Sequence, residues 1–203
     1  MQLVLATNNQ DKITEIRHLF DDLPVTILTR HDFLEFPNPD ETGATLVENA
    51  IIKAKTISQF CGLPALADDS GLEVDALGGA PGIYSSRYAG ENVTYADNYT
   101  KLLKNLRGIP RDRRTARFRC VIAIAWTPDD IQTVDGLAEG QIAEDIAGDK
   151  GFGYDPVFFF PPLNKRFSEM TLDEKNRISH RGLALQRART QIIERLNSLR
   201  RSG

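Results

Sequence analysis

Short apolar runs alternate with longer segments of helical periodicity along the first third of this 203-residue chain. Residues 3–6, 25–28 and 63–67 are apolar runs that are too short for helices, so we expect each to be a buried strand. Between them, residues 11–20 and 44–61 place apolar side chains at helical spacing. Strands that alternate with helices in this way indicate an α/β fold.

A long hairpin follows in the second half of the chain. Residues 114–126 alternate between polar and apolar side chains and then become continuously apolar, as in a strand partly buried on both faces. A turn at residues 127–130 leads to an expected partner strand at 132–143. The remaining predicted elements are a strand at 157–160 and helices at 94–106 and 182–199. Because a hairpin is antiparallel, we expect a mixed central sheet flanked by helices.

The composition fits a single soluble domain over residues 1–203. The hydrophobic content of 41% allows a sizeable core, and the net charge of -3 argues against a nucleic-acid binder, which usually has a basic excess. We interpret the arginines between 111 and 119 as a solvated strand face with nearby acids. Cys61 and Cys120 show neither metal-ligand spacing nor a disulfide framework. No signal peptide or membrane span is visible, so we expect a cytoplasmic protein.

Two adjacent carboxylates stand out where an apolar run ends, in the segment Asp68-Asp69-Ser70-Gly71. We expect the strand at 63–67 to stop here and to deliver acidic oxygens to a sheet edge, where α/β proteins commonly bind ligands. Oxygen ligands suit Mg²⁺, which often works beside a phosphorylated substrate. The alternative is an ordinary surface turn, because these residue types are common in turns.

A polar turn joins the first predicted strand to the first predicted helix. Backbone N–H groups at a helix N-terminus attract anions, and Lys12 adds a full positive charge there. The turn therefore suggests a phosphate site, although the glycines of a Walker A loop are absent. Taken alone, the turn is better explained as a plain strand–helix connection with an exposed lysine.

Three further segments contain candidate site residues, but each segment taken alone also has an ordinary structural explanation. Residues 40–43 place acids before the second helix, which carries Lys53, but such acids are also common helix caps. Residues 151–156 hold Phe152 and Tyr154 between glycines, which suits stacking on a nucleobase or burial in a core. His180 and Arg181 can donate hydrogen bonds to a keto oxygen or a phosphate, although such a pair at a helix start is usually structural.

The combination of these segments in this order resembles the inosine triphosphate pyrophosphatases, also called XTP/dITP diphosphatases. The matching motifs are LATNNQDK at 5–12, ETG at 41–43 with ENA at 48–50 and KA at 53–54, ADDSGL at 67–72, GGAPG at 78–82 with SRY at 86–88, GFGYDP at 151–156 and ISHRG at 178–182. Together they extend over essentially the whole chain.

The resemblance implies an elongated α/β fold with a mixed central sheet, two lobes and a substrate cleft between them. It also implies a homodimer that depends on Mg²⁺ and cleaves non-standard purine nucleoside triphosphates, such as dITP, ITP and XTP, to the monophosphate and pyrophosphate. Asp69 is implied as metal ligand and proton acceptor, Lys53 as a catalytic partner, and either Asp40 or Glu41 as the second metal ligand. The implied substrate-binding residues are Thr7, Asn8, Asn9, Gln10, Asp11, Lys12, Ser70 and Lys175 for the phosphates, and Phe152, Gly153, Tyr154, Asp155, His180 and Arg181 for the base.

Hydrogen-bond polarity gives a physical reason for such selectivity. Hypoxanthine and xanthine present a keto acceptor at position 6, whereas adenine presents an amino donor that Arg181 cannot accept. Each unpaired buried polar group costs roughly 1–3 kcal/mol, so such a mismatch supports rejection of adenine. The rejection of guanine needs a second feature that the sequence does not identify. The alternatives are a pyrophosphatase acting on dTTP or UTP and a nucleotide-binding module without catalysis.

Overall fold

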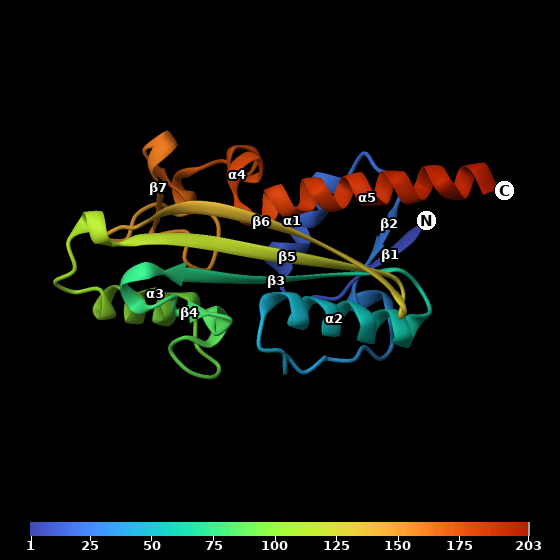
Figure 1. The fold of residues 1–203 in the computed structure, drawn as a ribbon, viewed down its shortest axis with the longest axis horizontal. Helices are drawn as coiled ribbons and strands as arrows, with labels where there is room; N and C mark the ends of the chain where they lie inside the picture. The colour runs from blue at the N-terminus through green and yellow to red at the C-terminus, as the bar shows by residue number, and fades with distance from the viewer. Residues whose placement is uncertain (203) are drawn as a thin grey trace. The chain divides into compact units, whose positions relative to one another are not determined.

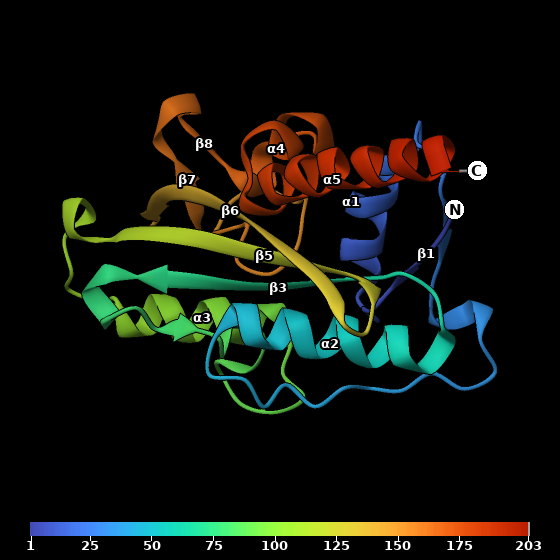
Figure 2. The same cartoon turned by 45° about the vertical axis from the view of Figure 1, so that its right-hand side comes forward.

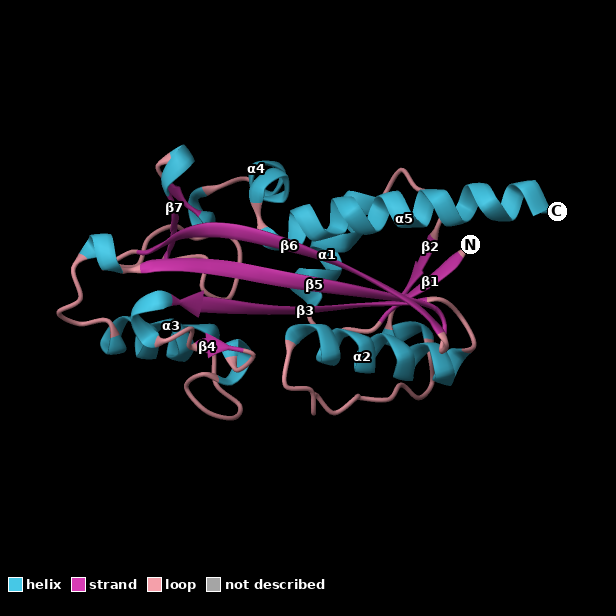
Figure 3. Cartoon of the chain, in the orientation of Figure 1, coloured by secondary structure: helices cyan, strands magenta, loops and turns pink. Residues whose placement is uncertain are grey.

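The computed structural model describes the backbone of residues 1–202 and the side chains of residues 1–201. Its strands are β1 (Gln2–Leu5), β2 (Thr26–Leu28), β3 (Ala65–Val74), β4 (Pro81–Gly82), β5 (Thr115–Thr127), β6 (Asp130–Ile142), β7 (Phe158–Phe160) and β8 (Lys165–Arg166). Its helices are α1 (Gln10–Phe20), α2 (Leu46–Cys61), α3 (Tyr95–Asn105), α4 (Leu172–Ile178) and α5 (His180–Ser202). Short 3₁₀ turns connect several of these elements (Figure 3).

The sheet is mixed, as predicted. Its strand order is β2-β1-β3-β5-β6-β7-β8, and β4 pairs with β3. Strand β1 runs parallel to both β2 and β3, whereas the β3–β4, β6–β7 and β7–β8 pairs are antiparallel. The expected α/β fold with a mixed sheet and flanking helices is therefore confirmed.

The chain divides into two compact units. The first unit contains residues 1–69, 120–136 and 181–202, and the second contains 70–119 and 137–180. Strands β3, β5 and β6 each contribute residues to both units. Two of the points at which the chain passes from one unit to the other lie inside predicted motifs. They are the Asp69–Ser70 and His180–Arg181 peptide bonds.

The first unit has helices on both faces of its strands. Helices α1 and α5 lie on one face and α2 lies on the other (Figures 1 and 2). The α1/α5 side holds one apolar cluster, to which Ile16, Phe20, Leu66, Ile122 and Leu185 contribute. Helix α2 begins at a capping box formed by its Thr45 cap and Glu48, and it ends at a glycine in the left-handed conformation.

The second unit has its own apolar cluster. Leu102 and Leu106 from the α3 segment pack there with Leu72, Phe158 and Phe167. The Arg117 guanidinium pairs with Asp75, and that of Arg119 pairs with Glu73, so these arginines do face nearby acids. Arg114 differs from that expectation, because its buried guanidinium donates to the carbonyl oxygens of residues 106, 109 and 143.

The prediction that the apolar strand stops at Asp68 was wrong. Strand β3 continues through Asp68, Asp69, Ser70 and Gly71 and ends only at Val74. These residue types favour a turn, but here neighbouring strands hold the backbone extended and other charges compensate the two carboxylates. Because consecutive side chains of a strand point to opposite faces, Asp68 and Asp69 lie on opposite faces of β3.

Two smaller differences concern the C-terminal region. Helix α5 begins at His180 rather than at residue 182, and α4 was not anticipated. Helix α4 has only seven residues, so its periodicity is short, but a capping box between Thr171 and Glu174 marks its start. Within the described part of the chain, no helix is both long and apolar enough to cross a membrane.

Candidate functional site

Asp68 and Asp69 extend from opposite faces of β3, although they are neighbours in sequence. Leu66 points into the cluster formed with α1 and α5, and Asp68, two residues further along the strand, faces the same helices. Asp69 points the other way and meets Lys53 from α2. The strand thereby separates the two carboxylates into two different environments.

The Asp68 face holds a buried group of alternating charges. The Asp68 Oδ2 atom accepts from Lys12 Nζ at 2.9 Å and from Arg181 Nε at 3.0 Å. Arg181 Nη1 in turn donates to Glu15 Oε2 at 2.8 Å. Asp68, Glu15 and Arg181 are each less than 5% exposed. These pairs tie α1 and α5 to the strand.

The electrostatics fix Asp68 in its ionised form. Burial alone would raise the pKa of this carboxyl, but Lys12, Arg181 and Lys53 lower it well below its usual range. Although burial opposes the charge on Arg181, the carboxylates of Asp68 and Glu15 raise the pKa of its guanidinium further. Asp68 is thus a permanent counter-charge and is poorly suited to accept a proton.

The Asp69 face is arranged around one ammonium group. Lys53 Nζ donates to Asp69 Oδ1 at 2.6 Å, to Glu41 Oε1 at 3.1 Å and to the backbone oxygen of Asp68 at 2.9 Å. Lys53 and Asp69 are buried, whereas the Glu41 side chain is 32% exposed. Two carboxylates from distant parts of the chain therefore converge on one point.

Asp69 differs from Asp68 in its protonation behaviour. Burial raises the pKa of the Asp69 carboxyl, and the favourable charge of Lys53 does not fully offset this effect. Burial would lower the pKa of Lys53, but Asp69, Asp68 and Glu41 raise it overall. The pKa values of these adjacent carboxyl groups therefore move in opposite directions, and Asp69 is the better suited of the two to accept a proton.

The convergence of Asp69 and Glu41 suits a magnesium ion. Mg²⁺ is usually held by one or two carboxylates and completes its shell with water and substrate oxygens. Among residues 1–201, no group of three or more His, Cys, Asp or Glu side chains is arranged to hold a metal. The Asp40 side chain is exposed and is not among the described partners of Lys53 or Asp69. Of the two predicted second ligands, Glu41 is the one that shares the Lys53 ammonium with Asp69.

The predicted phosphate turn is built around Asn9. Its side-chain oxygen caps α1 by accepting from the backbone N–H groups of Asp11, at 2.9 Å, and Lys12, at 3.2 Å. The Asn9 N–H group donates to the Thr7 hydroxyl at 3.2 Å. Asn8 lies in the same turn and Gln10 is the first residue of α1. The turn thus brings Lys12 to Asp68. Asn8 and Gln10 are exposed.

The second unit gathers the predicted aromatic segment around Asp155. The Asp155 Oδ2 atom accepts from the Phe152 N–H group at 2.9 Å and from Lys175 Nζ at 2.6 Å. The ammonium of Lys175 also lies 4.8 Å from the centre of the Phe152 ring, and the Tyr95 ring lies 5.9 Å from it. Lys175 was predicted to hold phosphates, but its described contacts are with this aromatic segment.

The remaining predicted residues of the second unit differ in exposure. Tyr154 is buried in the core, where its hydroxyl donates to the backbone carbonyl oxygen of Ser85 at 2.8 Å. Burial raises the pKa of its phenol well above the usual range. The His180 ring is buried and stacks on Phe118 at 4.5 Å. Ser70 is half-buried on β3, and Gly153 adopts a left-handed conformation with φ of 63°.

Sequence reasoning missed Glu15. This carboxylate is 4% exposed and neutralises Arg181, yet in sequence it resembles any polar residue beside the apolar face of α1. The only available signal was its position three residues after Lys12, which places both on neighbouring positions of one helix.

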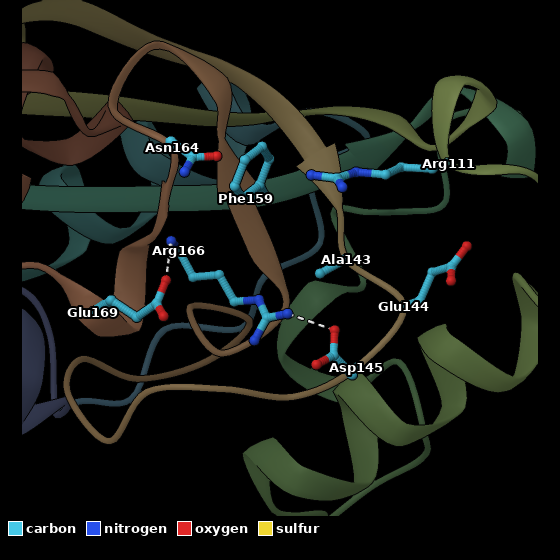
Figure 4. A pocket seen from close by; sticks show the side chains of 8 residues that line it. All are labelled: Arg111, Ala143, Glu144, Asp145, Phe159, Asn164, Arg166 and Glu169. Carbon is cyan, nitrogen blue, oxygen red and sulfur yellow. Dashed lines mark hydrogen bonds and ion pairs between the residues drawn. The ribbon is translucent and has the colours of Figure 1, made fainter.

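A separate cavity of about 350 Å³ lies within the second unit (Figure 4). Arg166 Nη2 there donates to Asp145 Oδ1 at 2.5 Å, and the Arg111 guanidinium lies 4.9 Å from the centre of the Phe159 ring. None of its lining residues was predicted as a site residue, and both guanidinium groups are already engaged. We therefore do not place the candidate site here.

The fold and the site define an α/β protein in which buried lysine and carboxylate groups suit anionic phosphates and a hard cation. A model of the Ham1 family matches residues 3–191, and the chain belongs to this family. It is 49% identical to a dITP/XTP pyrophosphatase of Desulforamulus reducens, with 97% of each chain covered. A HAM1 protein of Coxiella burnetii has a similar structure, with a TM-score of 0.88 and 43% identity over 96% of this chain and 99% of that one. For the Ham1 protein of Staphylococcus aureus the TM-score is 0.85 and the identity 37%, over 96% of this chain and 100% of that one.

Proposed function

We propose that this protein hydrolyses dITP, ITP and XTP to the corresponding monophosphate and pyrophosphate. The observation that carries the proposal is the Asp69 carboxyl, whose pKa burial raises and which lies against Lys53 and Glu41. The name of the Desulforamulus reducens relative supports the substrate class.

In this proposal Asp69 accepts the proton of the attacking water. The reaction breaks the bond between the α-phosphorus and the bridging oxygen, and pyrophosphate leaves with that oxygen. A carboxylate with a raised pKa takes up the proton of water more readily than an ordinary aspartate does. Lys53 holds the carboxylate in place through the 2.6 Å hydrogen bond and places positive charge beside the reacting phosphate.

Asp69 and Glu41 would hold the magnesium ion, and Lys53 would then share these carboxylates with it. When bound, Mg²⁺ supplies positive charge that stabilises the negative charge developing on phosphate oxygens. Asp68 has a different part, since it holds Lys12 beside the phosphate turn and is itself held by Arg181.

Base recognition would rest on the segment at 152–155 and on His180. Asp155 fixes the Phe152 backbone and positions Lys175 against its ring, which is suited to stacking on a base. We retain the prediction that Arg181 contacts the 6-keto edge of the purine base. Its Nε and Nη1 atoms are bonded to Asp68 and Glu15, so we assign it at least a positioning role.

The test is pyrophosphate release in the presence of Mg²⁺ from ITP, XTP, GTP, ATP and dTTP compared side by side. We expect ITP and XTP to be cleaved much faster than the other three, and a chelator to abolish release. Cleavage of dTTP alone would refute the base recognition, and release from none of the five would refute the activity.

We also propose a homodimer and a cytoplasmic location, both from the family resemblance. Sedimentation of the purified protein tests the first, because a dimer has twice the 22.7 kDa mass of one chain. Fractionation of the source cells tests the second.

A further inference from the structure

The charged groups that surround Asp68 and Asp69 do not by themselves neutralise a triphosphate. Lys12, Lys53 and Arg181 are three cations, but they are paired with the four carboxylates of Glu15, Glu41, Asp68 and Asp69. A nucleoside triphosphate carries about four negative charges at neutral pH, and one bound divalent cation supplies only two positive ones. Additional cations near the phosphate turn would therefore strengthen binding.

A cavity of about 450 Å³ adjoins this turn within the first unit. Its volume lies within the range of roughly 300–1,000 Å³ that is usual for small-molecule sites. The lining residues come from the phosphate turn, from α1 and from the segment after β2, and they are Thr7, Asn8, Ile13, Thr29, Arg30 and His31. Two of these residues have cationic or ionisable side chains, Arg30 with its guanidinium and His31 with its imidazole. Neither belongs to the sequence motifs.

The sheet explains why these segments meet. Strands β1 and β2 are parallel and pair Val4 with Leu28, so the residues that follow each strand emerge at the same edge. Beyond β2, the Thr29 backbone N–H and hydroxyl both donate to Asp32 Oδ2, at 2.7 and 3.1 Å. This closed turn sets the backbone of Arg30 and His31 beside Thr7 and Asn8.

Arg30 is available to bind an anion. Among residues 1–201, neither the Arg30 nor the His31 side chain takes part in an ion pair, and both residues are exposed. A guanidinium presents several N–H donors in a plane that matches two phosphate oxygens. In contrast to Lys12 and Lys53, Arg30 contributes a positive charge that no described carboxylate of the first unit pairs with.

We propose that this cavity binds the β- and γ-phosphates of the substrate, and pyrophosphate after cleavage, with Arg30 as the main donor and His31 beside it. This inference rests on the proposed function for the identity of the ligand. It adds two residues of the segment after β2 to the phosphate-binding set.

The test compares Arg30→Ala and Arg30→Lys with Arg200→Ala as the control. Arg200 is an exposed arginine in the last turn of α5, so this control makes the same change in net charge without altering the cavity. For Arg30→Ala we expect about a tenfold rise in the KM for ITP and in the dissociation constant of Mg²⁺-pyrophosphate measured by calorimetry, which corresponds to losing one charged hydrogen bond. Arg30→Lys should recover most of the affinity, and Arg200→Ala should match the unaltered protein.

Inhibition by IMP locates the effect, because IMP lacks the β- and γ-phosphates. An unchanged IMP inhibition constant in Arg30→Ala supports the proposal, whereas an equal loss for IMP and pyrophosphate would overturn it. Unchanged affinity for both ITP and pyrophosphate would overturn it as well. Calorimetry with pyrophosphate needs no turnover, so a protein that binds pyrophosphate through Arg30 but cleaves no ITP would refute the proposed activity and leave this site standing.

Discussion

At the scale of single residues, the adjacent carboxylates of Asp68 and Asp69 have opposite properties because a strand turns them to opposite faces. Asp68 is enclosed by Lys12 and Arg181, whereas Asp69 pairs with Lys53, which also binds Glu41. The family resemblance assigned a role to Asp69 alone, but the sequence pattern predicted that the strand ends before both residues. The continuation of β3 through this segment explains why their environments differ.

The substitution Asp69→Asn should remove activity but not the fold. Asparagine keeps an oxygen that accepts from Lys53 but cannot take a proton, so we expect pyrophosphate release to fall by at least about 10²-fold. The matched variant Asp68→Asn should lose roughly 3 kcal/mol of stability, because it breaks a buried charge group. Thermal melts and activity assays of both variants check this, and an active Asp69→Asn variant would exclude Asp69 as the base.

The depressed pKa of Asp68 also predicts how stability depends on pH. Since the unfolded chain protonates this carboxyl near its ordinary pKa of about 3.9 and the folded protein resists protonation, its contribution is complete above that pH and is lost as the pH falls below it. Denaturant unfolding between pH 6 and pH 2.5 measures this loss. The decline should be shallower in Asp68→Asn, and parallel curves for both proteins would contradict the account.

At the scale of elements, the loop at residues 151–155 depends on a glycine that permits close approach. Gly151 has φ of 73°, and a Cβ atom there would lie 2.1 Å from Asp155 Oδ2. That oxygen binds both the Phe152 N–H group and the Lys175 ammonium. The glycine therefore supports the carboxylate that organises the aromatic segment.

Gly151→Ala should cost more than the matched variant Gly62→Ala. Gly62 ends α2 with φ of 66°, and no described atom lies within 4 Å of the position that a Cβ atom would take there, so alanine meets only the left-handed penalty of about 1 kcal/mol. The clash at Gly151 should add roughly 1–3 kcal/mol and raise the KM for ITP. Equal melting temperatures for the two variants would show that the loop adapts freely.

Elements with a clear period or a continuous apolar run were predictable from the sequence, whereas the short helix α4 and the continuation of β3 through charged residues were not. Helix α2 has a repeated apolar face, a capping box and a C-terminal glycine, so its limits could be read closely. Helix α4 has seven residues and lacks enough turns to show a period. Glu15 escaped notice because its partner Arg181 lies 166 residues away, and local patterns do not report such contacts.

At the scale of the whole molecule, the two units are interleaved along the chain. The backbone crosses between them four times, and β3, β5 and β6 contain residues of both. We therefore retain the prediction of one domain and expect a single cooperative unfolding transition. Calorimetry should give equal calorimetric and van't Hoff enthalpies, whereas two resolved transitions would show that the units unfold independently.

Single-turnover hydrolysis of ITP in water enriched in ¹⁸O, followed by mass analysis of both products, tests the proposed reaction. Attack on the α-phosphorus, with Asp69 as the proton acceptor, predicts that the label enters the monophosphate and that Asp69→Asn forms little labelled product. Label in the pyrophosphate, or release of inorganic phosphate instead, would contradict the proposed reaction.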